Sequence, residues 1–298
     1  MRPILAVTLF AAVVVPSTRA QEPAHVADAS PAHAIYDVAH ATAARDERSA
    51  VGEALLRQLE SETPSADLRA TLAAFASKMP SSPRAAARLT TLGADESLDA
   101  PELERRLEAL IEDLRFAPFM QAEVPVGFPA PAPVDEIVLK LYPEYRMAKT
   151  PMRTTMGTPF FALFNHIQRN EIPMTAPVQV EFDAADPRAR RTTSMAFLYE
   201  TRELGPAGPD AADERVEVVD LPAMTTVTIG ARGYDSPARI AELRAVLEAW
   251  LAGQGGRFAP AGPLRTMGYN SPMVPAPRRF FEVELPITRA AGQPVVAK

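Results

Sequence analysis

A proline-rich segment near the middle of the chain divides the sequence into two parts with different patterns. Residues 117–133 (APFMQAEVPVGFPAPAP) contain five prolines. Proline fixes the backbone φ angle and removes a hydrogen-bond donor, so this segment cannot continue a helix or lie in the centre of a sheet. We interpret it as a stiff, extended linker and place a domain boundary near residue 134.

The sequence before this linker, residues 34–116, has the apolar spacing of helices. The last helix is the clearest, because Asp99 is a good N-cap and Pro101 falls in the first turn. Its apolar residues form one stripe: Leu103, Leu107, Leu110 and Leu114. We expect three or four amphipathic helices, whose stripes must be buried against each other or against the rest of the chain.

After the linker, the apolar period changes to two. Val178, Val180 and Phe182 alternate with polar residues, and so do Phe281, Val283 and Leu285, which leave Glu282 and Glu284 on the opposite side. Alternation of this kind predicts strands with one buried face. Residues 194–199 and 225–229 are strand-like by composition. Helices are expected over 160–168 and, between the cap Ser236 and Gly253, over a second and longer segment.

The second part of the chain also shows a weak internal repeat. Residues 137–149 and 216–229 each combine two strand patterns around a Leu-Tyr-Pro or Asp-Leu-Pro turn, and each is followed by a helix and a proline-containing strand. The pattern favours two strand–helix–strand–strand units. Such units would pair face to face, with a cleft at their junction that could take a ligand.

Composition excludes several classes of function. The net charge is −6, which gives no basic footprint for nucleic acid, so we expect no nucleic-acid partner. There is no cysteine, which excludes disulfides, thiolate metal sites and a cysteine nucleophile. The sequence has no Gly-x-Ser-x-Gly, P-loop or His-Glu-x-x-His motif and no Gly-x-Gly-x-x-Gly before a helix. We therefore expect a binding protein rather than an enzyme.

The first twenty residues have the pattern of a signal peptide. Arg2 precedes an apolar run over residues 4–15, and small residues surround a cut after Ala20. We expect export to the periplasm or the extracellular space, with residues 21–33 as a flexible lead-in. An uncleaved membrane anchor is the alternative. No other stretch reaches the ~20 apolar residues that a bilayer requires, so no membrane span is expected after signal removal.

Residues 170–178 (NEIPMTAPV) carry a resemblance to a known family. They are similar to the Asn…Ile-x-Met-Thr-Ala-Pro-Val signature of SOUL haem-binding proteins. Three other segments agree in order, and they begin at Tyr142, at Phe161 and at Tyr269. The resemblance covers residues 134–288, which leaves 289–298 as a tail. His166 stands where the family helix often has an aromatic residue, and Phe280-Phe281 replaces the usual Asn beside Arg278-Arg279.

The resemblance implies a fold and a function. The fold is α+β, with a C-terminal SOUL-like distorted antiparallel β-barrel, two flanking helices and a pseudo-twofold repeat, preceded here by an all-α N-terminal region. The implied function is non-covalent binding of haem or another tetrapyrrole in an apolar groove, as a carrier, buffer or sensor. Three alternatives stay open: a module that binds a different hydrophobic small molecule, as in related effector-binding domains; a hydrolase that uses a cleft carboxylate; and an interaction scaffold built on the helices.

Haem requires apolar walls, a basic rim and, in some proteins, an axial ligand. The only histidine after residue 40 is His166, which is either that ligand or a hydrogen-bonded replacement for an aromatic residue. Met152 and Met174 are candidate ligands or pocket walls. The candidate walls are Phe160, Phe161 and Phe164, and the basic residues that could pair with propionates are Arg153, Arg146, Lys149, Arg278 and Arg279. His25, His33 and His40 do not have the spacing of a zinc site.

Overall fold

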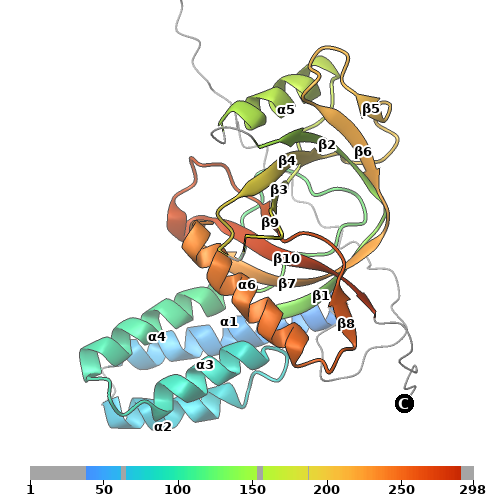
Figure 1. Cartoon of the computed structure of the whole chain (residues 1–298). Helices are drawn as coiled ribbons and strands as arrows, with labels where there is room; N and C mark the ends of the chain where they lie inside the picture. The colour runs from blue at the N-terminus through green and yellow to red at the C-terminus, as the bar shows by residue number, and fades with distance from the viewer. Residues whose placement is uncertain (1–37, 62–64, 153–156, 187, 290–298) are drawn as a thin grey trace, which may run out of the picture.

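A computed structural model describes residues 38–61, 65–152, 157–186 and 188–289. Four helices pack against one another at one end of the molecule, beside a strand-rich region that carries two further helices (Figure 1). The first four are α1 (Val38–Glu60), α2 (Ser65–Ala76), α3 (Pro83–Ala94) and α4 (Ala100–Arg115). The predicted signal peptide, lead-in and most of the tail lie outside the described residues.

Helix α4 forms where the sequence predicts it. The side chain of Asp99 accepts a hydrogen bond from the backbone N–H of Glu102, so the carboxylate satisfies one of the free donors of the first turn. The leucine stripe is buried against α1 to α3 in a core that includes Leu55, Leu72 and Leu89. The helices therefore bury their apolar faces mainly against each other.

The strands form one ten-stranded antiparallel sheet in the order β1-β7-β10-β9-β3-β4-β2-β6-β5, with β8 paired to β10. The bounds are β1 (Ile137–Tyr142), β2 (Tyr145–Pro151), β3 (Val178–Phe182), β4 (Thr192–Leu198), β5 (Gly208–Pro209), β6 (Glu217–Leu221), β7 (Met224–Arg232), β8 (Phe258–Pro260), β9 (Arg265–Gly268) and β10 (Phe280–Arg289). The α+β class is confirmed. The sheet is not a closed barrel, because β1 and β5 end the order without pairing to each other.

The strand order contains the predicted repeat. Each strand of the first unit has a counterpart in the second: β1 corresponds to β6, β2 to β7, β3 to β9 and β4 to β10. Replacing every strand by its counterpart gives the same order of strands, read from the other end of the sheet. The helices obey the same exchange, since α5 (Gly157–Arg169) contacts β2 and β4 while α6 (Pro237–Ala252) contacts β7 and β10. The pseudo-twofold axis lies between β3 and β9, where the two units meet.

The two helices cover one face of the sheet, which we call the helix face. Between the helices and the sheet lies one apolar core. In it, Leu163 and Ile167 of α5 and Leu243 and Leu247 of α6 pack with the apolar residues of the strands. Helix α6 has the predicted cap, since Ser236 accepts a hydrogen bond from the N–H of Arg239. Helix α5 begins earlier than the predicted residue 160. Proline is tolerated in a first turn, whose N–H groups have no intrahelical partner, so Pro159 does not delay the start.

The opposite face, which we call the polar face, is also buried. Glu282 and Glu284 have no solvent exposure, so the expectation that β10 buries only one face is wrong. Residues 116–134, which we call the strap, cover this face and include the segment predicted as a linker. Phe128 of the strap packs edge-on against Tyr142 and Tyr145, with ring centroids 4.9 and 5.1 Å apart. The segment is extended as predicted, but it covers the sheet instead of spacing two domains.

The strap crosses β7 at Gly230. A Cβ atom at this position would lie 2.6 Å from the carbonyl oxygen of Ala132 and 2.7 Å from that of Pro133. The N–H of Asp135 donates to the carbonyl of Gly230 over 2.8 Å, which holds the two backbones together. Only glycine allows this close approach.

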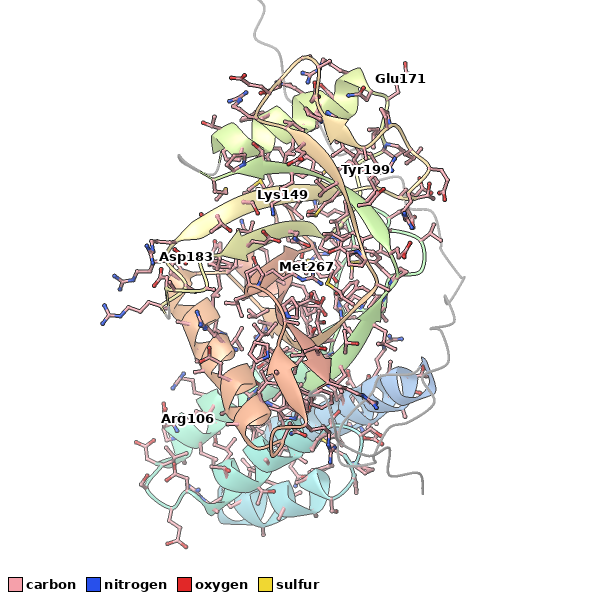
Figure 2. The ribbon with its side chains drawn as sticks, turned by 45° about the vertical axis from the view of Figure 1, so that its right-hand side comes forward. Arg106, Lys149, Glu171, Asp183, Tyr199 and Met267 are labelled. Carbon is pink, nitrogen blue, oxygen red and sulfur yellow. The ribbon has the colours of Figure 1, made fainter. Side chains whose placement is uncertain are left out.

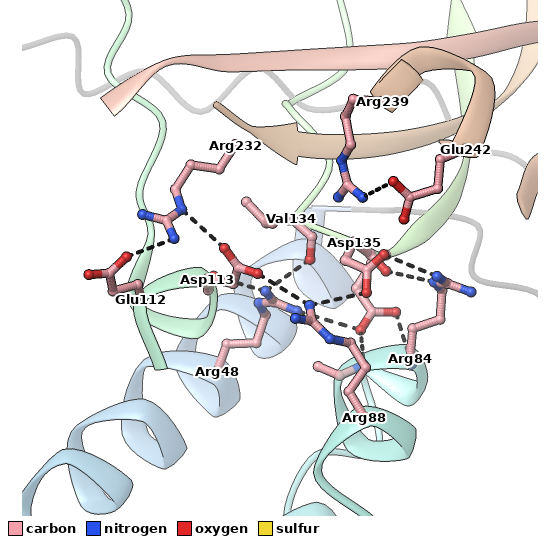
Figure 3. A network of polar contacts seen from close by, with 12 residues as sticks. Arg48, Arg84, Arg88, Glu112, Asp113, Val134, Asp135, Arg232, Arg239 and Glu242 are labelled. Atoms are coloured by element: carbon pink, nitrogen blue, oxygen red, sulfur yellow. Dashed lines mark hydrogen bonds and ion pairs between the residues drawn. The ribbon is translucent and has the colours of Figure 1, made fainter. Parts of the chain in front are cut away.

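Buried polar contacts join the four-helix region to the end of the strap (Figure 3). Arg48 of α1 is 3% exposed and donates to the carbonyls of Asp113 (3.0 Å) and Val134 (2.9 Å). Glu136 accepts hydrogen bonds from the N–H groups of Ala85 (2.8 Å) and Arg84 (3.3 Å), so its carboxylate caps α3 from outside the helical region. Burial raises the pKa of Glu136 to about 7 in spite of these donors.

We expect Gly230→Ala to lower the free energy of unfolding by about 1–3 kcal/mol, because the new methyl group must displace the backbone of the strap. Urea unfolding followed by circular dichroism measures the change. Gly253→Ala is the matched control, because a Cβ there meets its nearest atom at an ordinary 3.4 Å. Equal stability of the two variants would contradict the assigned role of the crossing.

Candidate ligand-binding site

Three phenylalanines of α5 form what we call the aromatic ledge: Phe160, Phe161 and Phe164. The ring of Phe160 is stacked on Phe164 with centroids 6.2 Å apart, and it is edge-on to Phe161 at 5.8 Å. Phe160 also contacts the buried Phe197 of β4, with centroids 5.1 Å apart. Phe161 is 61% exposed. The ledge therefore extends the core to the surface and presents one aromatic ring to solvent.

Met152 and Met174, also candidates from the sequence, are partly buried against the same core as Phe160 and Phe164. The structure thus places four of the predicted residues on one apolar cluster. Arg153 lies outside the described residues. A flexible thioether at the edge of such a cluster can adapt to an apolar ligand.

His166 points away from solvent and is 4% exposed. Its Nε2 lies 2.7 Å from the hydroxyl of Tyr199, which follows β4, and its Nδ1 contacts the carboxylate of Asp210, which follows β5. Figure 2 shows Tyr199 at the end of the domain that carries α5. Both ring nitrogens are therefore engaged, and ligation of iron would require one of these contacts to break. This environment favours the hydrogen-bonded replacement over the axial ligand.

The partners of His166 are held in defined protonation states. Burial alone would raise the pKa of Asp210, but hydrogen bonds from His166, Ala212 and Arg169 lower it to about 2. Burial raises the pKa of Tyr199 to about 12, so its hydroxyl is neutral. The contacts connect α5 to two loops of the sheet and make His166 a structural element of the domain.

Most of the basic residues proposed for a propionate already have partners. Arg146 pairs with Asp220 (2.7 Å) and Lys149 pairs with Glu181 (2.9 Å). Arg279 donates to the carbonyl of Val274 over 2.6 Å. The guanidinium of Arg278 lies 5.5 Å from the ring centroid of Phe119, and no carboxylate of the described residues pairs with it.

The polar face holds a network of buried charges that the sequence analysis did not find. Lys140 of β1 lies 2.6 and 2.7 Å from the two carboxylate oxygens of Glu282, which also accepts from the hydroxyl of Tyr269 (2.7 Å) and the N–H of Ala132 (2.6 Å). Burial raises the pKa of Glu282, and the ammonium of Lys140 opposes this effect.

A second carboxylate of this face has a similar set of partners. Glu284 accepts from Arg265 Nε (2.9 Å) and from the hydroxyls of Tyr142 and Thr228. Arg265 also donates to the hydroxyl of Tyr145 over 2.8 Å. The only sequence signal for this network was the alternation of Glu282 and Glu284, which is also the pattern of an exposed strand face.

Five glutamates of the strand-rich region are covered by the strap, exposed to solvent or already paired. Glu282 and Glu284 are covered by the strap, while Glu144 and Glu171 are exposed. Glu181 pairs with Lys149 and accepts from Ser194. The described residues also contain no group of three or more histidine, aspartate or glutamate side chains placed to hold a metal ion. None of the helices described has the length and apolarity to cross a bilayer.

The comparison with protein families agrees with the fold. The model of the SOUL heme-binding protein family matches residues 134–286, just over half of the chain. The chain therefore belongs to the SOUL heme-binding protein family. The match covers the sheet from its first strand into β10, together with α5 and α6.

Solved structures show more distant likenesses. The C-terminal domain of EcmrR aligns with 15% identity and a TM-score of 0.39, covering 52% of this chain and 99% of that one. A hydrolase from Listeria innocua aligns with 12% identity and a TM-score of 0.38, covering 53% and 94%. SAV2435 bound to tetraphenylphosphonium aligns with 9% identity and a TM-score of 0.33, covering 51% and 94%. The search of curated proteins found no match.

We expect Lys140→Met to lower the free energy of unfolding by about 3–5 kcal/mol, because it leaves the charge of Glu282 buried without its counter-ion. Lys149→Met is the matched control, since its ion pair with Glu181 is partly exposed and should contribute at most about 1 kcal/mol. Guanidinium unfolding measures both losses. Glu282→Gln should restore part of the stability of Lys140→Met, and equal losses in the two lysine variants would argue against the network.

Proposed function

We propose that this chain is an exported SOUL-family protein that binds haem or another tetrapyrrole non-covalently, as a carrier, buffer or sensor. The membership of the family supports tetrapyrrole binding. The observation that supports a binding site on the aromatic ledge is the exposed ring of Phe161, which continues the stacked pair Phe160 and Phe164. A flat apolar macrocycle can pack on such a surface, because aromatic rings gain from offset or edge contacts as well as from burial.

The residues of the ledge fit a mode of binding that does not use an imidazole. His166 is hydrogen-bonded through both nitrogens, so affinity would come from ring packing, with Met152 and Met174 as adaptable neighbours. Haem would supply its own redox and ligand chemistry when bound. In this mode the iron contributes little, and an iron-free porphyrin binds about as well as haem. An apolar ligand of another class could use the same surface.

We expect haemin titrated into the purified protein to give a saturable shift of the Soret band. Phe161→Ala should weaken haemin binding about two- to tenfold, which corresponds to roughly 0.5–1.5 kcal/mol for one aromatic contact. Tyr234→Ala, which removes an equally exposed ring elsewhere (58%), is the matched control and should have no effect. Iron-free protoporphyrin should bind within about threefold of haemin.

Three results would count against this proposal: no saturable spectral change, equal effects of the two ring deletions, or a strong preference for the iron-containing ligand. The last result would direct attention back to axial ligation. His166→Gln would then test the histidine, provided that the far-ultraviolet circular dichroism of the variant is unchanged.

Export is proposed from the pattern of residues 1–20. We expect the protein recovered from a cell fractionation to begin at Gln21, which an intact mass measurement can establish. A mass that includes residues 1–20 in a membrane fraction would instead indicate a retained anchor.

A further inference from the structure

A pocket of about 410 Å³ lies where the four-helix region meets the strand-rich region. It is bounded by α1, α4, the beginning of the strap, the end of β7 and the short 3-10 helix η1 (Ala276–Arg278). The volume lies within the ~300–1,000 Å³ typical of small-molecule sites, and the boundary between two folding units is a common place for such sites. None of its lining residues belongs to the aromatic ledge.

Aromatic rings form one wall of the pocket. Phe116 is stacked on the buried Phe280, with ring centroids 6.1 Å apart, so its position is fixed by the core. Phe119 is 42% exposed and carries the guanidinium of Arg278 at 5.5 Å from its ring centroid. A flat ligand could therefore pack against a ring while remaining close to a cation.

The charges of the pocket leave one arginine without a counter-ion. Arg115 pairs with Glu53 (2.6 Å). Arg232 is held by Glu112 (2.8 Å) and by Asp113 (3.0 Å), as Figure 3 shows. Among the described residues, no carboxylate pairs with Arg278. Both acids that line the pocket are thus paired with arginines, whereas the exposed guanidinium of Arg278 lies beside the aromatic wall without a carboxylate partner among the described residues.

We propose that this pocket binds a small, flat aromatic monoanion, such as an aromatic carboxylate or sulfonate. The ring of the ligand packs against Phe119 and its anionic group pairs with Arg278, whose planar guanidinium suits a carboxylate or sulfonate. A dianion is disfavoured because Glu53 and Glu112 line the same pocket. The site is independent of the proposed haem site, so failure of haemin binding would not affect it.

The probe is 8-anilinonaphthalene-1-sulfonate, titrated into the purified full chain and followed by its fluorescence. N-phenyl-1-naphthylamine, which has the same rings without the sulfonate, is the matched neutral ligand. We expect the sulfonate to bind at least tenfold more tightly than the neutral analogue. Arg278→Gln should weaken binding of the sulfonate about tenfold and leave the analogue unchanged, and Phe119→Ala should also weaken the sulfonate.

One control variant separates the pocket from other charged surfaces. Arg257→Gln removes an exposed arginine after α6 that does not line the pocket. It should not change binding of the sulfonate. The proposal is overturned if no saturable binding occurs, if Arg278→Gln has no more effect than Arg257→Gln, or if Phe161→Ala is the variant that abolishes binding.

Discussion

The pairing of charged groups beneath the strap is the constraint on which the rest of this structure depends. Glu282 and Glu284 lie at the centre of a sheet that is covered on both faces, and an uncompensated carboxylate there would cost several kcal/mol. Each has a cation and at least one hydroxyl group as partners. One donor to Glu282 is the backbone N–H of Ala132 in the strap. The buried carboxylate would lose this hydrogen bond if the strap left the sheet.

This requirement gives the four-helix region a physical role. Arg48 donates to the carbonyl of Asp113, just before the strap, and to the carbonyl of Val134 at its end. One buried side chain of α1 thus holds the two ends of the strap together. Glu136 adds a cap to α3 from the sheet side. The helices, the strap and the sheet are therefore coupled through polar groups. The polar face is covered, whereas Phe161 of the aromatic ledge and Phe119 of the pocket are exposed.

The sequence predicted the elements whose signals are local. Helix α4 and helix α6 have caps that are used as expected, because an N-cap acts within three residues of itself. The strands on either side of Leu-Tyr-Pro and Asp-Leu-Pro are also present, and so is the repeat that contains them. They do not form hairpins, because β1 pairs with β7 and β2 pairs with β6, each across the two units. The candidate site was partly accessible: the aromatic ledge is recognisable in the sequence, but the burial of His166 by Asp210 is not, since the two residues lie 44 positions apart.

By itself, the sequence determined the family, the order of helices and strands, and the pseudo-twofold repeat, because motif, cap and period are properties of short segments. The tertiary structure alone decided which face of each strand is buried. The alternation of Glu282 and Glu284 with apolar residues is the same for a strand that faces water and for one that a distant proline-rich segment covers. The free energy of a buried charge depends on the partners brought to it by the fold, and those partners come from β1, β7, β9 and the strap, far away in the sequence.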